Sequence, residues 1–246
     1  MVLAAMVVIA IAYVTAAVIA VRRGRTHSTA STIAFLAGLA VLAVAMRESW
    51  GAYDDGTPWV HDAQHALVMG VAPALLALGA PVRLSLQVLP TRWARRVVGA
   101  LQVRPLRALC GPGAAVHVPL DYYGVMAAYL FTPWAQLADD NAAVHVVTHG
   151  VFLVCGLLFW VPVVGADVGG WRPDRLTSLR LVAVGIPVYA GFALATSSLS
   201  LLVVNEAATV FGLTVVALHR RGTRVAVPRQ RVHEPLVLAP APVAPP

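Results

Sequence analysis

Long apolar runs, separated by short polar segments, dominate the chain from its first residues onward. The runs cover residues 2–21, 30–46, 59–79, 106–119, 122–134, 141–162 and 181–218. About 20 consecutive apolar residues are enough for a helix to cross the hydrocarbon core of a bilayer. The last run is too long for one crossing, and the polar residues 196–198 divide it into two. The pattern therefore predicts an all-α fold, a polytopic transmembrane helical bundle of about seven spans.

The fourth span is predicted to be short. It covers residues 106–119, with His117 at its outer end. The apolar residues 122–134 that follow are then expected to dip back into the outer leaflet as a re-entrant half-helix. The next span begins near Asn141, a residue type that commonly caps the start of a helix.

Composition supports a membrane protein. The chain is 59% hydrophobic and only 12% charged, whereas soluble domains carry about 25% charged residues. The formal net charge is nevertheless +7, the chain contains no lysine, and all arginines except Arg47 fall in clusters between apolar runs. Such clusters mark the cytoplasmic ends of spans. We therefore expect a multi-pass protein of the bacterial plasma membrane, with its N-terminus outside and its C-terminus in the cytoplasm, and no nucleic-acid partner.

Two segments outside the spans have predicted structures of their own. Between Arg83 and Arg107, arginines alternate with apolar and aromatic residues, which predicts a cytoplasmic loop with a short amphipathic helix on the lipid headgroups. Residues 225–246 are basic and then rich in Pro, Ala and Val, which predicts a disordered tail. The predicted division is a transmembrane domain at 1–224 and a cytoplasmic tail at 225–246.

Two pairs of histidines carry the candidate chemistry. In each pair the histidines are four residues apart, at the start of an apolar run and just after a cluster of carboxylates. Side chains four residues apart lie on one face of a helix. The predicted topology places both pairs, together with one more histidine, at the outer ends of three spans. The candidate metal ligands are therefore His61, His65, His145, His149 and His117.

Imidazoles gathered at one depth from several helices can share a metal ion. Neutral imidazole suits copper, zinc, iron and nickel, and the thioether of Met69 would favour Cu(I). Met69 lies about 12 Å deeper than His61 along a helix, so its expected role is core packing. The carboxylates of Asp62 and Asp121 either orient imidazole N–H groups or are solvated residues of the membrane boundary. Glu206, an ionisable residue in the last span, implies a role or a partner.

Several segments between residues 59 and 165 carry a resemblance to a known family. They are Trp59 to Pro81, Arg104-Pro105, His117 to Asp121 and His145 to Pro162. In these segments the sequence resembles the CtaG family of bacterial membrane proteins, which are implicated in assembling caa-type cytochrome c oxidase. The resemblance implies a protein that helps to deliver copper to oxidase subunits, with the two histidine pairs as the positions to test. The chain departs from the family pattern at Asp62, where an apolar residue or Met is expected, and at Asn205-Glu206.

Our preferred hypothesis is a non-enzymatic assembly factor that binds copper at the outer membrane face and passes it to an oxidase subunit. One alternative is an electron-transfer protein that holds haem b between histidines of facing helices. Another is a transporter of copper, in which Glu206, Cys155 and Met69 form an inner path. The three hypotheses differ in where the ligands lie and in how much space surrounds them.

Overall fold

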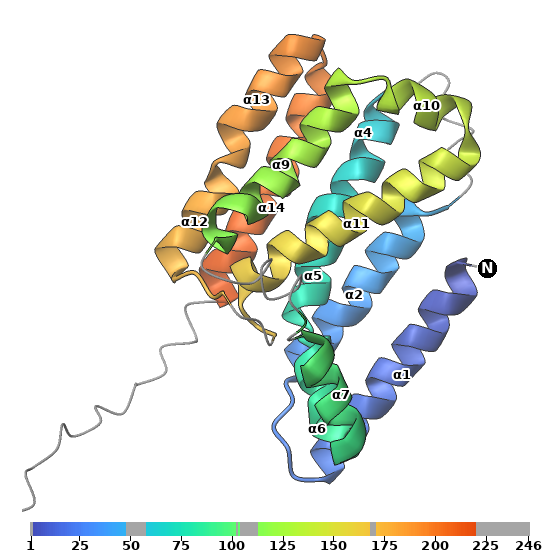
Figure 1. Ribbon diagram of the computed structural model, residues 1–246, viewed down its shortest axis with the longest axis vertical. Helices are drawn as coiled ribbons and strands as arrows, with labels where there is room; N and C mark the ends of the chain where they lie inside the picture. Colours follow the sequence, from blue (N-terminus) through green and yellow to red (C-terminus); the bar gives the residue numbers. More distant parts are fainter. Residues whose placement is uncertain (1, 48–57, 102, 104–112, 168–170, 220–246) are drawn as a thin grey trace, which may run out of the picture.

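The computed structural model describes residues 2–47, 58–101, 103, 113–167 and 171–219 of the chain (Figure 1). Every regular element in these residues is a helix, and no strand occurs among them, which confirms the predicted all-α fold. Five helices are long and apolar enough to cross a membrane, judged by length and composition. They are Leu3–Arg22, Trp59–Val88, Ala142–Val164, Arg175–Thr196 and Leu199–His219. The predicted tail at 225–246 lies outside the described residues.

Two shorter apolar helices complete the bundle. They are α2 (Thr29–Ala45) and α9 (Ala114–Phe131). In Figure 1, α1 (Val2–Arg22) descends, α2 ascends, and the later long helices continue to alternate in direction. This alternation agrees with the arginine pattern, in which every second connection is basic. The number of spans and their orientation stay predictions.

The histidine-bearing helix near the centre of the bundle is a continuous run of three segments. They are α4 (Pro58–Ala66), the π-helical η2 (Leu67–Val71) and α5 (Ala72–Leu78). Within Trp59–Val88, 61% of an apolar 18-residue stretch is buried, against 39% or less for the corresponding stretches of the other four helices. The amide of Ala72 donates to the Leu67 carbonyl, a bond between residues five apart. This wider turn lets the helix continue through Pro73, which lacks an amide hydrogen.

A glycine sets the close contact between this central run and α11 (Ala142–Val164). Asn141 starts α11 as predicted, because its side chain accepts hydrogen bonds from the amides of Ala143 and Val144. Further along the helix, a Cβ atom at Gly156 would lie within 2.4 Å of the Met69 carbonyl oxygen. Only glycine fits there without movement of the backbone, so the two helices that carry the histidine pairs pack in direct contact.

The last apolar region divides into two helices where it was predicted to. α13 (Gly185–Thr196) ends at Ser197, which adopts a left-handed conformation with φ of 56°, and α14 (Leu199–His219) follows at once. The hydroxyl of Ser200 then donates to the Asp62 carboxylate at 2.5 Å. This bond ties the start of α14 to α4, because Asp62 lies between the two histidines of that helix.

The predicted end of the fourth span at residue 119 is wrong, and its predicted start at residue 106 lies outside the described residues. The described chain resumes at Gly113, and α9 then runs without interruption from Ala114 to Phe131, with Pro119 inside it. The predicted separate half-helix at 122–134 is therefore wrong, because residues 122–131 are the C-terminal part of α9 and the short α10 (Trp134–Asp140) follows. Neighbouring groups allow proline within membrane helices, so Pro119 does not end the span. His117 consequently lies near the beginning of α9 and not at its outer end.

The arginine-rich segment forms two short helices, α6 (Pro81–Val88) and α7 (Thr91–Leu101). None of the side chains of α7 is buried, and the Arg96 guanidinium lies 4.6 Å from the centre of the Trp93 ring. A short helix in this segment is thus confirmed. Its contact with lipid headgroups stays a prediction.

A buried carboxylate holds the start of α6. Asp167 is only 3% exposed, and its two carboxylate oxygens accept hydrogen bonds from the amides of Val82 at 2.9 Å and Arg83 at 2.7 Å. These amides belong to the first turn of α6, which follows Ala80 in a left-handed conformation. The chain after α11 is thereby fastened to the inner end of the central run.

We expect Asp167→Ala to lower the free energy of unfolding by about 1–2 kcal/mol, because it leaves two amides at the start of α6 without an acceptor. Thermal unfolding of the purified protein in detergent micelles measures the effect. Asp174→Ala is the matched control, since Asp174 caps α12 (Arg175–Ala183) by accepting from the Thr177 amide in an exposed position. Equal losses in the two variants would contradict a special role for the buried carboxylate.

Candidate metal centre

The first histidine pair lies on α4. His61 and His65 are one turn apart, and their ring centres are separated by 4.2 Å. Regular helical geometry from Pro58 onward places both side chains on the same face. The hydrogen bond from the Gln64 side chain to the Ala45 carbonyl, at 2.7 Å, fixes the rotation of α4 against the end of α2. Both imidazoles therefore point to the side of α4 that faces α11.

The second pair lies on α11 in the same arrangement. The ring centres of His145 and His149 are 4.4 Å apart. Because Asn141 defines where α11 begins, His145 stands in the first turn and His149 one turn further in. The hydroxyl of Thr148, next to His149, accepts a hydrogen bond from the Trp134 indole at 2.8 Å. This bond links α11 to α10.

The two pairs meet across the contact between α4 and α11. The ring centres of His61 and His145 are 5.8 Å apart, and those of His65 and His149 are 5.4 Å apart. Each histidine thus has one neighbour on its own helix and one on the other. We call this group of His61, His65, His145 and His149 the four-histidine cluster. The sequence prediction that both pairs lie at the same depth agrees with this geometry.

Burial divides the cluster into two layers. His65 and His149 are 4% and 5% exposed, whereas His61 and His145 are half-buried. The edges of Tyr129 and Phe152 pack against His65, each with its ring centre 4.9 Å away. Aromatic rings therefore enclose His65 in the deeper pair, and the less buried pair lies nearer the surface.

Imidazole nitrogens of the cluster lack protein partners. The Nε2 atoms of His61, His65 and His149 are buried, and none of them has a hydrogen-bond partner among the described residues. Buried polar atoms are normally hydrogen-bonded, because an unpaired one costs about 1–3 kcal/mol. Nitrogen atoms that are buried together without partners have the donor set that a metal ion needs, so the residues fit an imidazole-bound metal.

An aspartate that the sequence prediction did not include completes the outer layer. One carboxylate oxygen of Asp139 and one nitrogen each of His61 and His145 all lie within 4.8 Å of one another. Asp139 is exposed and stands near the end of α10. The sequence signal for it was the carboxylate cluster just before Asn141, but its place beside His61 depends on how α10 folds back over α11.

The other predicted residues lie elsewhere. His117 is roughly 18 Å along α9 from Tyr129, the residue of this helix that contacts the cluster. There its Nδ1 atom lies 3.4 Å from the Asp121 carboxylate. The structure thus brings together four of the five predicted histidines and separates His117 from them. Asp62 accepts from Ser200, which gives its carboxylate a partner other than an imidazole.

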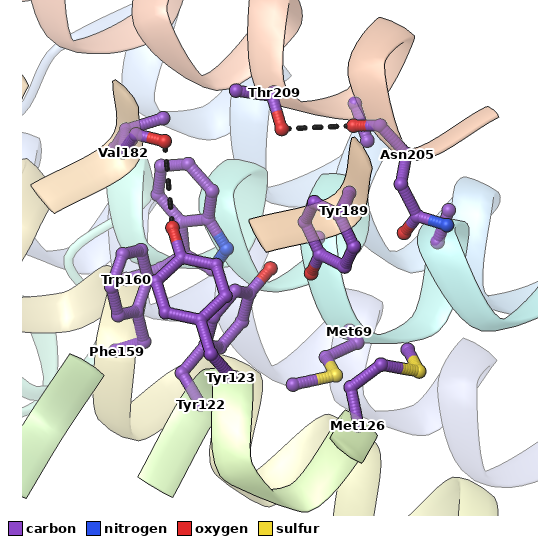
Figure 2. Close-up of a pocket in the computed structure, with 13 residues that line it drawn as sticks. Met69, Tyr122, Tyr123, Met126, Phe159, Trp160, Val182, Tyr189, Asn205 and Thr209 are labelled. Carbon is purple, nitrogen blue, oxygen red and sulfur yellow. Dashed lines mark hydrogen bonds between the residues drawn. The ribbon is translucent and has the colours of Figure 1, made fainter. Parts of the chain in front are cut away.

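Met69 lies below the cluster and lines a separate cavity. This cavity lies between η2, α9, α11, α12, α13 and α14, and Figure 2 shows Met69 and Met126 on its wall together with tyrosines and Asn205. Glu206 follows Asn205 on α14, and its buried Oε1 atom has no hydrogen-bond partner within the described residues. The expected depth difference between Met69 and the histidines agrees with this arrangement.

Comparisons with known proteins give relatives for most of the chain. Uncharacterised proteins of Mycobacterium bovis and Mycobacterium tuberculosis are each 31% identical to it over 207 residues, which are 80% of this chain and 30% of the relative. An uncharacterised protein of Mycobacterium leprae is 26% identical over 203 residues, 79% of this chain and 30% of the relative. The chain therefore spans about 30% of the length of these relatives. No solved structure matches the chain significantly.

A family comparison covers the same region and includes the whole candidate site. The model of the cytochrome c oxidase caa3 assembly factor family matches residues 11–209. This range extends from α1 to the middle of α14 and contains both histidine pairs, Asp139 and the cavity below them. The chain belongs to the cytochrome c oxidase caa3 assembly factor family.

Proposed function

We propose that the four-histidine cluster binds copper at the outer membrane face and delivers it to cytochrome c oxidase during assembly. The observation that carries this proposal is the meeting of two histidine pairs from separate helices, with cross-helix ring separations of 5.4 and 5.8 Å. Three of the four imidazoles have a buried Nε2 atom without a partner in the described chain. Such a set of nitrogen donors suits a transition-metal ion.

Copper is the metal that fits both the histidine ligands and the role of the family. Imidazole binds copper, zinc, iron and nickel, and the family assembles an oxidase. The outer layer, with half-buried imidazoles and the exposed carboxylate of Asp139, gives an incoming ligand access to a bound ion. Transfer by exchange of ligands requires no covalent catalysis, so the proposed role is that of an assembly factor and not of an enzyme.

The packing of the cluster favours an ion over a haem. The rings of His65 and His149 meet edge to face, with an interplanar angle of 74°, and Tyr129 and Phe152 pack on His65. A macrocycle between these imidazoles would have to displace the aromatic edges. A sharp absorption band of the dithionite-reduced protein would instead support the haem alternative.

The proposed setting is the bacterial plasma membrane, with the oxidase as the partner. Several apolar helices of sufficient length support a membrane protein. The cluster lies at the end of the bundle where α4 and α11 begin and α9 ends (Figure 1). With the orientation predicted from the arginines, this end faces outward, so an oxidase subunit would receive copper at that face.

Replacing all four histidines by alanine tests the proposal. We expect the purified wild-type protein to hold Cu(I) bound by imidazole nitrogen, and the variant to lose this nitrogen-bound copper, in X-ray absorption at the copper edge after removal of free copper. His117→Ala is the matched control, because it removes an imidazole far from the cluster. In cells that lack the protein, the four-alanine variant should fail to restore oxidase activity under low copper, whereas the wild type should restore it. Equal nitrogen coordination of copper in wild type and variant would falsify the metal-binding step.

A further inference from the structure

The cavity below the four-histidine cluster has features that packing alone does not require. The volume in which the centre of a water-sized molecule fits is about 10 Å³. A cavity of this size can hold about one water molecule or one ion. Thioether, phenol and amide groups line it, among them Met69, Met126, Tyr189 and Asn205 (Figure 2). These groups come from helices of both halves of the chain. The cavity therefore has the size and the donor atoms of a site for one ion.

Two thioethers share the wall of this cavity. Met69 and Met126 are 1% and 2% exposed, and Figure 2 shows their sulfur atoms below Tyr189 and Asn205 in the view. Met69 belongs to η2, whose widened turn is a feature that often marks functional sites within helices. α11 packs closely against this turn, because a Cβ atom at Gly156 would lie 2.4 Å from the Met69 carbonyl oxygen. Soft thioether ligands select Cu(I) over harder divalent ions.

The cavity is one helical turn away from the deeper histidine pair on two helices. On the central run, Met69 follows His65 by four residues, and Ala66 between them also lines the cavity. On α9, Tyr129 packs against His65, and Met126 precedes it by three residues. Residues three or four apart are neighbours on a helix surface. Both helices thus lead from the cluster to the thioethers within one turn.

A half-buried carboxylate lies on α14, one of the helices that line the cavity. Glu206 follows Asn205 on α14, and it is near enough to Tyr189, another residue of the wall, to interact with it electrostatically. Its Oε1 atom is buried and has no hydrogen-bond partner in the described part of the chain. An ionisable group inside a membrane helix is costly unless something compensates it. A cation in the cavity would supply that compensation.

We infer that this cavity is a second metal site, in which the thioethers of Met69 and Met126 bind Cu(I) one turn below the four-histidine cluster. The site is filled by ligand exchange, without oxidation or reduction of the metal. The inference shares with the proposed function the premise that the chain handles copper. It requires an additional binding position, however, and this position can be detected when the histidines are absent.

Selenomethionine labelling separates the two sites. The labelled protein is prepared with all four histidines changed to alanine, loaded anaerobically with Cu(I) and measured by X-ray absorption at the copper edge. We expect selenium in the first coordination shell, because only methionine can supply it. Adding Met69→Leu and Met126→Leu, substitutions that conserve volume, should remove both the selenium signal and the retained copper. Met6→Leu is the control and should leave the signal unchanged, because Met6 lies in α1 and is not part of the cavity wall.

Each result decides the inference. Selenium around copper that disappears only with the Met69 and Met126 changes supports it. Absence of selenium from the coordination shell, or a signal that persists without these two methionines, overturns it. The proposed function is judged separately, because it depends on copper bound through nitrogen in the protein with intact histidines. A wild-type protein with nitrogen-bound copper and no selenium contact would keep the proposed function and remove the second site.

Discussion

Changing His65 and His149 together to alanine should lower the affinity for Cu(I) by at least about 100-fold. This loss of affinity exceeds the about 10–100-fold that follows when a residue that only orients a ligand is removed. These two imidazoles form the buried layer of the cluster, where water reaches a vacated ligand position poorly. The outer double variant, His61→Ala with His145→Ala, should lose less, about 10–100-fold, because Asp139 and solvent can take the open positions. Competition with a chromogenic Cu(I) chelator gives both affinities.

The His117→Ala variant provides the control for this comparison. His117 is an imidazole of the same membrane domain, but it pairs with Asp121 near the start of α9, so its removal should leave the affinity unchanged. Far-UV circular dichroism and gel filtration establish that each variant keeps the helical fold. Equal losses of Cu(I) affinity from the buried and the outer pair would show that the two layers do not differ. A loss of affinity in the His117 variant would show that the metal site is not confined to the four-histidine cluster.

Changing Gly156 to alanine lowers the melting temperature and weakens copper binding together. The new Cβ atom would meet the Met69 carbonyl oxygen at 2.4 Å and Pro73 Cγ at 2.7 Å. Backbone and a proline ring cannot move aside as a flexible side chain can, so α11 must shift away from the central run. Overpacking of this kind costs about 1–3 kcal/mol. Because the shifted helix carries His145 and His149, the distances across the cluster must change as well.

Gly150→Ala is the matched control for this prediction. Gly150 lies on the same helix, and a Cβ atom there would meet nothing within 4 Å. Alanine in a helix is favoured over glycine by about 1 kcal/mol, so this variant should melt at the same or a higher temperature and bind copper as the wild type does. Thermal unfolding in detergent and chelator competition measure both quantities. A Gly156 variant that behaves like the Gly150 variant would disprove the tight contact.

The sequence predicted the cluster because its information is local. Two histidines four residues apart share a helix face wherever the helix lies, and the pattern of apolar runs placed both pairs at the starts of two spans. Asn141 could be identified as a cap for the same reason, since its partners are the next amides along the chain. These features needed no knowledge of how the helices pack.

The predictions were wrong or incomplete where tertiary contacts determine the limits of a helix or the neighbours of a side chain. The sequence pattern predicts the end of a span at Pro119, but α9 continues through it to Phe131. His117 therefore lies near the start of this helix and not near its end. Asp167 and Val82 form their hydrogen bond across 85 residues of sequence, and Asp139 reaches His61 only because α10 turns back. None of these contacts has a local signature.

The layered burial of the four histidines has a consequence for the kinetics of transfer. In the proposed copper site, an incoming ligand would meet His61, His145 and Asp139 first, because these residues are less buried than the other two histidines, and they would set how fast copper enters and leaves. The enclosed pair, His65 and His149, sets how long an ion stays when no acceptor is present. A partner that brings its own ligand to the mouth can replace the outer contacts one at a time, so handover can be quick while spontaneous leakage is slow. The proposed site would thereby hold its ion tightly and still release it on encounter with a partner.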